Sequence, residues 1–79
     1  MRLPRAVSAG TLIRALEDLG YRVVRQKGSH VRLRHDGPPA HSISIPRHDS
    51  LKIGTLHGIL TEVAQFRAMS TETLAALLA

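Results

Sequence analysis

The first quarter of the chain carries apolar residues at the spacing of one helical face. These residues are Leu12, Ile13, Leu16 and Leu19. Ser8 precedes them as a candidate N-cap, because its hydroxyl can accept a hydrogen bond from a free amide of the first turn. Gly20 follows them, where glycine takes the left-handed conformation cheaply and ends a helix. The pattern predicts a helix over residues 9–19, after an extended lead-in over residues 1–7.

The middle of the chain changes to the alternation that is typical of strands. In residues 30–34, Val31 and Leu33 share one face. The opposite face carries His30, Arg32 and Arg34. Residues 21–26 predict an earlier strand, whose faces are ambiguous because the pair Val23-Val24 interrupts the alternation.

A third strand is predicted over residues 41–45, which end at a proline. Ile43 and Ile45 face the core in this strand. Its outward residues are Ser42 and Ser44. The pairs of strands are joined by Lys27-Gly28 and by residues 36–39, and both links favour tight turns. The three strands therefore predict an antiparallel meander.

A second helical stripe follows the strands. It comprises Leu56, Ile59, Leu60, Val63 and Phe66. Gly54-Thr55 opens this helix, whose stripe is expected to face the core. Ser70 caps a short last helix. The apolar side of that helix is predicted to be Leu74, Leu77 and Leu78.

The order of these elements predicts a single α+β domain over residues 1–79. Its core spans about residues 8–66 in the order α-β-β-β-α, and residues 70–78 add a helical extension. Helices packed on one face of a three-stranded antiparallel sheet bury the apolar residues of both layers. The buried set is expected to be Leu12, Leu16, Val31, Leu33, Ile43, Ile45, Leu56, Ile59 and Leu60. The opposite face of the sheet is then basic and carries His30.

The distribution of charge along the chain indicates a binding surface. The net charge is +5, and between Arg22 and Arg34 there are five basic residues and no acid. A basic stripe of this kind favours a polyanion partner, while a solvated face that keeps the protein soluble is the alternative. Tyr21 and Phe66 are the only aromatic residues, which excludes base stacking on an aromatic platform.

The composition also bears on the compartment. The chain contains no cysteine, so neither disulfides nor thiolate zinc sites are expected. No apolar run follows Arg2 and Arg5, which argues against a signal peptide. No run approaches the roughly 18 apolar residues of a membrane span. A cytoplasmic protein without a membrane partner is the expectation.

Five histidines are candidates for chemistry. His30 follows Gly-Ser at a turn, and we predict it to be a general acid or base; a surface histidine on a basic strand is the alternative. The ordinary pKa of histidine is about 6.5, so both protonation states exist near neutrality. His35 is expected to be exposed before a turn. His41, His48 and His57 are expected at the sheet edge, in a loop and on the solvent side of the second helix.

Other catalytic patterns are missing from the sequence. There is no zinc-finger spacing, acidic cluster, Gly-x-Ser-x-Gly or P-loop, and no metal or cofactor is predicted. Ser29 and His30 are not a catalytic pair, because neighbours on a strand point to opposite faces. Lys52 before Gly54-Thr55 can mark a helix N-terminus that binds phosphate or a plain helix start.

Three short motifs follow one another along the chain. They are Gly28-Ser29-His30, then Ile45-Pro46-Arg47-His48, and then Lys-x-Gly-Thr-Leu-x-x-Ile-Leu over residues 52–60. In this order, and in a chain of this length, they resemble the HicA (YcfA-like) toxins of toxin–antitoxin pairs. The resemblance runs from about Ser8 to Phe66, and each motif alone is weakly specific.

The resemblance implies a fold like that of double-stranded-RNA-binding domains (dsRBD-like). It implies an mRNA interferase, an endoribonuclease that stops translation by cutting transcripts, and a HicB-type antitoxin that covers the active site. The catalytic histidine of the family falls on His30, in a turn supported by Gly28 and Ser29. Family members have Ser or Gly at the middle position, so Ser29 is not expected to be a nucleophile.

RNA carries its own nucleophile, the 2′-hydroxyl, so a positioned histidine can cleave it without a metal. One positioned acid or base typically contributes about 10²–10⁴-fold. We expect Lys27 and Arg32 to be the main phosphate contacts. Further contacts are predicted for Arg25, Arg34, Arg47 and Lys52. The second proton-transfer group is open between His48 and water.

Two other functions fit the same residues. A non-catalytic RNA-binding module on the basic face predicts salt-sensitive binding and no dependence of RNA integrity on His30. A protein-interaction domain that docks an acidic partner predicts no RNA affinity at physiological salt.

Overall fold

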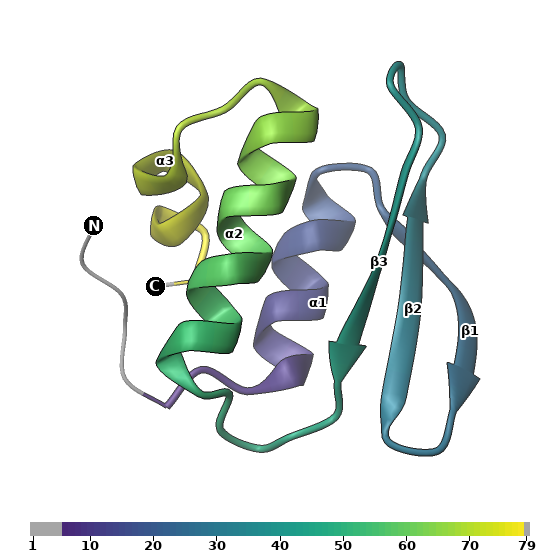
Figure 1. Ribbon diagram of the computed structural model, residues 1–79, viewed down its shortest axis with the longest axis vertical. Helices are drawn as coiled ribbons and strands as arrows, with labels where there is room; N and C mark the ends of the chain where they lie inside the picture. The colour runs from purple at the N-terminus through teal and green to yellow at the C-terminus, as the bar shows by residue number, and fades with distance from the viewer. Residues whose placement is uncertain (1–5, 79) are drawn as a thin grey trace.

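A computed structural model describes residues 6–78 of the chain and contains six elements. They are α1 (Ala9–Asp18), β1 (Arg22–Lys27), β2 (His30–His35), β3 (His41–Pro46), α2 (Ile53–Arg67) and α3 (Thr71–Ala76). The strands form one antiparallel sheet in the order β1-β2-β3 (Figure 1). This confirms the predicted α+β, dsRBD-like arrangement. The predicted lead-in over residues 1–7 lies mostly outside the described residues.

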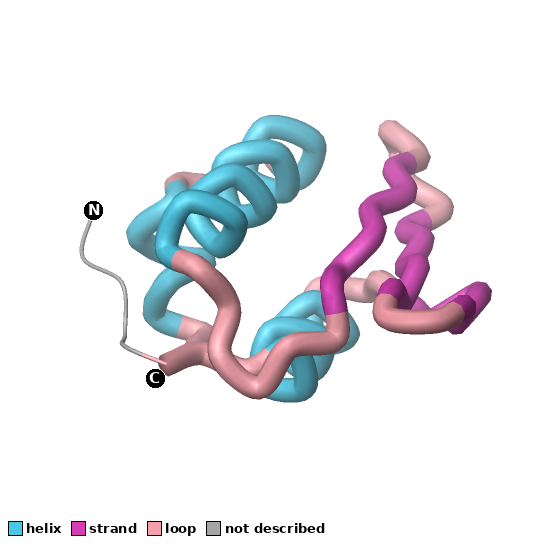
Figure 2. The backbone as a smooth tube through the Cα atoms, turned by 60° about the horizontal axis from the view of Figure 1, so that its bottom comes forward, coloured by secondary structure: helices cyan, strands magenta, loops and turns pink. Residues whose placement is uncertain are grey.

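The sheet forms one layer, and α1 and α2 cover one of its faces (Figure 2). The residues that meet between the layers are those predicted from the alternation. Among them, Leu12, Leu33, Ile45 and Val63 have no solvent-exposed surface. Burying a leucine or isoleucine side chain stabilises the fold by about 1.5–3 kcal/mol. The opposite face of the sheet has no helix against it in the described part of the chain.

Helix α1 begins where its sequence predicts. The hydroxyl of Ser8 accepts a hydrogen bond from the Thr11 amide at 3.1 Å. The helix ends one residue earlier than predicted, with Leu19 as its C-cap. Gly20 then has a φ of +100°, and a Cβ there would lie 2.9 Å from Nε2 of His35. Glycine is therefore required at this position both by its backbone conformation and by its neighbour.

A β-bulge resolves the ambiguous alternation of β1. Val23 pairs with Leu33 and Arg25 pairs with Arg32, so Val24 is the extra residue. The bulge lets Val23 face the helices while Arg25 and Lys27 face outward, which a regular register does not allow. The strand also begins and ends one residue later than predicted, and the turn that follows it is Gly28-Ser29.

The residues that α2 and α3 bury are those of the predicted apolar stripes, with one exception. Leu56, Ile59, Leu60 and Val63 are buried in α2 as predicted, and Phe66 is half-buried. Ser70 caps α3, where its hydroxyl accepts a hydrogen bond from the Thr73 amide. Leu74 and Leu78 are buried, but the prediction for Leu77 was wrong, since it is 41% exposed. Ala75 is buried in its place, because positions 74, 75 and 78 share one helical face.

A hydrogen-bond chain centred on the buried His41 joins the sheet to α2. Nδ1 of His41 lies 2.7 Å from the Tyr21 hydroxyl, and Nε2 lies 2.6 Å from the Glu62 carboxylate. A neutral imidazole satisfies both, because it accepts from Tyr21 at one nitrogen and donates to Glu62 at the other. Phe66 stacks on the same imidazole. His41 faces the core, as its parity predicts, on the edge strand β3.

His35 is half-buried rather than exposed, so that prediction was wrong. Its Nδ1 accepts a hydrogen bond from the Gly37 amide at 2.8 Å and also contacts the Arg67 guanidinium. Its Nε2 therefore carries the proton and donates to the carbonyl of Leu19 at 3.1 Å. This side chain ties the end of α1 to the loop after β2, a long-range contact that the position before a turn does not reveal.

None of the helices in the described residues is long and apolar enough to cross a membrane.

The buried tyrosine gives the first prediction. Burial raises the pKa of Tyr21 above 10.0, and the nearby Glu62 carboxylate raises it further, while Arg67 opposes both. Tyr21 is the only tyrosine and the chain has no tryptophan, so its ionisation can be followed by ultraviolet absorbance. The native protein should form tyrosinate at higher pH than the chemically denatured protein.

The unfolded state then ionises first as pH rises past 10.0, so the free energy of unfolding falls from there until the native pKa is reached. Identical titration curves for the native and denatured protein would contradict the burial of Tyr21.

Candidate nucleic-acid interface

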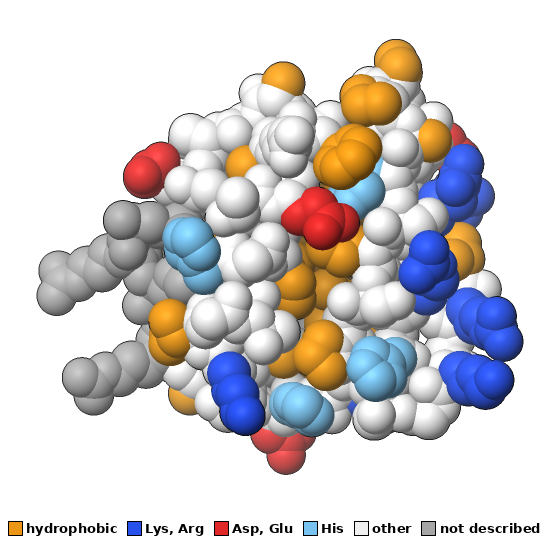
Figure 3. Space-filling view, viewed as in Figure 1, with side chains coloured by type: hydrophobic (Ala, Val, Ile, Leu, Met, Phe, Trp, Pro, Cys, Tyr) orange, Lys and Arg blue, Asp and Glu red, His pale blue; other side chains and the backbone are white. Residues whose placement is uncertain are grey.

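The exposed face of the sheet carries five of the eleven Lys and Arg residues of the chain. We define this basic face by the side chains that point away from the helices. They are Arg22, Arg25 and Lys27 from β1, His30, Arg32 and Arg34 from β2, and Ser42 and Ser44 from β3. In Figure 3, Lys and Arg side chains cluster on the side of the molecule formed by the sheet.

The register of the strands arranges the basic face in three rows. The rows are Lys27–His30–Pro46, Arg25–Arg32–Ser44 and Arg22–Arg34–Ser42. Side chains directly opposite each other on neighbouring antiparallel strands have Cβ atoms about 4.5–5.5 Å apart. His30 therefore has Lys27 as its direct neighbour, and the pair Arg25–Arg32 forms the next row. Positive charges this close repel each other, and an anion that binds beside them relieves this repulsion.

One acidic residue, Asp36, compensates the positive charge at only one end of the basic face. Asp36 binds Arg22 at 2.8 Å and Arg34 at 3.2 Å. The hydrogen bond from Arg22 is the main cause that lowers the pKa of Asp36, and Arg34 adds to it. None of the ion pairs within residues 6–78 involves Arg25, Lys27 or Arg32. The uncompensated positive charge therefore lies at the end that holds His30.

His30 is the first residue of β2 and is exposed. The preceding Gly28 has a φ of +57°, in the left-handed region that glycine adopts without strain. The carbonyl of Ser29 accepts a hydrogen bond from the Arg47 amide at 2.7 Å, so the turn is tied to the chain beyond β3. The hydroxyl of Ser29 lies 3.5 Å from Nδ1 of His30, too far for a strong hydrogen bond.

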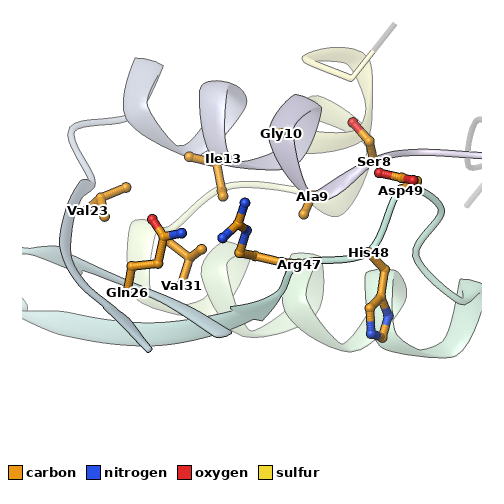
Figure 4. Close-up of a pocket in the computed structure, with 10 residues that line it drawn as sticks. All are labelled: Ser8, Ala9, Gly10, Ile13, Val23, Gln26, Val31, Arg47, His48 and Asp49. Carbon is orange, nitrogen blue, oxygen red and sulfur yellow. The ribbon is translucent and has the colours of Figure 1, made fainter. Parts of the chain in front are cut away.

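Arg47 and His48 follow β3 and lie beyond the end of the sheet. Arg47 lines a pocket between α1, β1 and the loop after β3, where its guanidinium points toward Gln26 (Figure 4). The ring of His48 points away from that guanidinium. Two backbone bonds hold this loop to the start of α1, from Ala9 to the His48 carbonyl and from Leu51 to the Val7 carbonyl. No hydrogen bond joins His48 to His30 in the described structure.

Lys52 is exposed and is the N-cap residue of α2, without a side-chain capping bond. The first turn of α2 carries no acidic residue. The helix begins at the same end of the molecule as the turn between β1 and β2 (Figure 1). The six predicted phosphate contacts therefore fall into two groups. Arg25, Lys27, Arg32 and Arg34 share one face, while Arg47 and Lys52 lie beyond the end of the sheet.

Sequence reasoning missed the role of Asp36. It was assigned to a turn, and its pairing with Arg22 depends on the antiparallel register, which places position 22 opposite position 34. Glu62, as the partner of a core histidine, also carries no local signal. Within residues 6–78 no group of three or more potential metal ligands occurs.

Comparison with known proteins gives one match. The model of a protein family described as the HicA toxin of bacterial toxin–antitoxin systems matches residues 10–64, which is more than half of the chain. The matched stretch includes the whole basic face and the first part of α2. No curated protein and no solved structure matches the chain.

Neutralising Asp36 should strengthen binding of single-stranded RNA to the basic face. Asp36→Asn releases Arg22 and Arg34, and each added phosphate contact steepens the dependence of log affinity on log salt by about 0.7. The measurement is a salt titration of RNA affinity in a His30→Ala background, so that the cleavage predicted for His30 does not interfere. Asp49→Asn is the matched control, because it makes the same charge change in an exposed loop off this face. Equal slopes for the two variants would contradict the assignment.

Proposed function

Because the chain belongs to the HicA toxin family, we propose that it is an mRNA interferase that cleaves transcripts with His30 as general acid or base. As a family member, it is a toxin of a toxin–antitoxin system and has an antitoxin partner. The proposal adds the chemistry, the RNA substrate, a HicB-type antitoxin and a cytoplasmic site of action. One observation supports it most strongly. The exposed His30 stands at the end of the basic face where the cations lack carboxylate partners.

The reaction that fits one histidine on a basic surface is transesterification. The imidazole of His30 takes the proton of a 2′-hydroxyl, whose oxygen attacks the adjacent phosphorus. The bond from phosphorus to the 5′-oxygen breaks, which leaves a 2′,3′-cyclic phosphate and a 5′-hydroxyl. Lys27, beside His30 in the sheet, and Arg32 in the next row stabilise the negative charge that builds on the phosphate. The nucleophile belongs to the RNA, so this step needs no metal.

The leaving 5′-oxygen needs a proton. His48 was a candidate donor, but no hydrogen bond joins it to His30 in the described structure, and its ring points away from the guanidinium of the neighbouring Arg47 (Figure 4). Water is therefore the donor in our proposal. Ser29 has no part in the proton transfers, because its hydroxyl is 3.5 Å from the imidazole and no base stands behind it.

A non-catalytic RNA-binding module is the second candidate. The observation in its favour is that, among the described residues, the imidazole of His30 has only one hydrogen-bond partner, the Ser29 hydroxyl at 3.5 Å. Catalytic histidines are usually oriented by a second group. On this alternative, the basic face binds RNA and RNA integrity does not depend on His30.

Replacement of His30 separates these two functions. Purified His30→Ala should cleave single-stranded RNA about 10²–10⁴-fold more slowly than the wild type, because one acid or base is lost. Its RNA affinity should change little, since the flanking cations remain. Cleavage is measured on end-labelled RNA, with circular dichroism to verify the fold. Full cleavage by a folded His30→Ala would rule out the proposed catalytic role.

The products provide a further control on the same reaction. Wild-type cleavage should leave cyclic phosphate and 5′-hydroxyl ends and should persist in EDTA. Cleavage that leaves only 5′-phosphate ends, or that EDTA abolishes, would refute the metal-independent step.

Gly28 should matter through the backbone alone. A Cβ at this position meets nothing within 4 Å, but the φ of +57° is unfavourable for a β-branched residue. Gly28→Val should therefore move His30, and a displacement near 1 Å costs about 10²-fold in rate. Gly28→Asn is the matched control, because asparagine tolerates this conformation and should retain most of the activity. Equal cleavage by the Val and Asn variants would show that the turn does not position His30.

A further inference from the structure

The two edges of the sheet differ in how they are protected. The edge strand β1 carries a bulge at Val24 and exposes Arg22, Arg25 and Lys27, and both features discourage pairing with another strand. The edge strand β3 has neither. It pairs with β2 in an unbroken register and has no charged residue between His41 and Pro46.

The register identifies which main-chain groups of β3 are free. The Arg47 amide donates to the Ser29 carbonyl, so these two residues form a hydrogen-bonded pair. Hydrogen-bonded and non-hydrogen-bonded pairs alternate along antiparallel strands, which fixes the type of every other pair of β2 and β3. Ile43 and Ile45 therefore exchange their bonds with β2. Ser42 and Ser44 direct both N–H and C=O away from it, and no described residue bonds to these groups. Pro46 has the same parity, so its missing N–H costs the sheet nothing.

A groove runs beside this free edge. It lies between β3 and α2, and Figure 3 shows hydrophobic side chains in the hollow beneath an acidic one. Its walls include Ser42 and Ser44 from β3, Arg32 from β2, and Gly54, Gly58 and Glu62 from α2. A strand added to β3 would occupy this groove, with alternate side chains toward α2 and toward the basic face.

No contact within the described part of the protein requires glycine at positions 54 and 58 of α2. Glycine inside a helix is unfavourable relative to alanine, yet a Cβ at Gly54 or Gly58 would meet nothing within 4 Å. Both residues are exposed, and both line the groove. Small residues there leave room for the side chains of a chain that approaches from outside.

The chemistry of the groove favours a peptide over RNA or a second copy. Ser42 and Ser44 each offer a donor and an acceptor, which a peptide main chain matches at every second residue. Phosphates are acceptors only, and Glu62 repels them. A second copy would bring another net charge of +5 and its own Arg32 to the same edge. An acidic side chain on the outer side of an added strand would instead meet Arg32, which has no ion pair among the described residues.

We propose that an extended segment of the cognate antitoxin adds to the sheet as a fourth strand along Ser42–Ser44. It places small or apolar side chains over Gly58 and an acidic one beside Arg32. Strand addition requires only that the chain is a toxin with an antitoxin. A second consequence, competition between the antitoxin and RNA for Arg32, rests on the proposed function.

The test compares Ser44→Pro with Ser44→Ala. Both lose the hydroxyl that accepts from Arg32 at 3.2 Å, but only proline removes the outward N–H. Both variants are made in a His30→Ala background, and the cognate antitoxin is titrated by calorimetry. Ser44→Ala should bind like its parent. Ser44→Pro should bind at least about tenfold more weakly, the effect of one hydrogen bond in a buried interface.

Amide hydrogen exchange provides a second measurement that needs no variant. The Ser42 and Ser44 amides should exchange rapidly in the free toxin and become protected in the complex. Equal affinity of the two Ser44 variants, with both amides still unprotected, would overturn the proposal. This readout does not involve cleavage, so it is independent of whether the protein is an endoribonuclease.

A second pair of variants covers the case in which Ser44→Pro fails to fold. Gly58→Gln fills the groove without harming the helix and should weaken antitoxin binding. Gly10→Gln makes the same change at an exposed glycine of α1 that lies outside the groove and should not. Equal binding by these two variants would also overturn the proposal. So would a free toxin that dimerises in sedimentation experiments and loses the dimer on Ser44→Pro, because the second copy would then be the occupant.

Discussion

The whole molecule depends on the fact that helices cover only one face of a three-stranded sheet. Successive residues of a strand point to opposite faces, so each strand must be apolar on one side and polar on the other. In β2 this rule buries Val31 and Leu33 and exposes the residues between them. The same contacts that stabilise the core therefore fix which side chains form the basic face. A shift of one residue in register would exchange the two sets.

The position of a histidine along β2 and β3 decides what it does. His35 and His41 face each other at one end of this pair of strands and are held by Tyr21, Glu62 and Arg67. Their nitrogens are occupied, so they act as structural cross-links. His30 stands at the other end, exposed, opposite a proline and beside a lysine. Asp36 neutralises the basic face near the structural histidines and leaves the charge near His30 uncompensated.

The sequence predicted the features that depend on local pattern. Helix caps at Ser8 and Ser70, both helical stripes and the faces of β2 and β3 follow from periodicity and capping chemistry, and the structure confirms them. The features that were missed are set by contacts distant in sequence. The bulge at Val24 places Val23 on the helix side of the sheet, opposite Leu33, while Arg25 and Lys27 face outward in register with Arg32 and His30. The burial of His35 and the pairing of Asp36 likewise arise only once the strands are aligned.

The central claim is that toxicity arises from RNA cleavage by His30. Its most direct test is to induce the wild type and His30→Ala in the same host without the antitoxin and to follow transcript integrity and growth. The account predicts that the wild type degrades transcripts and arrests growth, whereas a stably expressed His30→Ala does neither. Arrest by both variants with intact transcripts would contradict it and would place the toxicity in RNA binding alone.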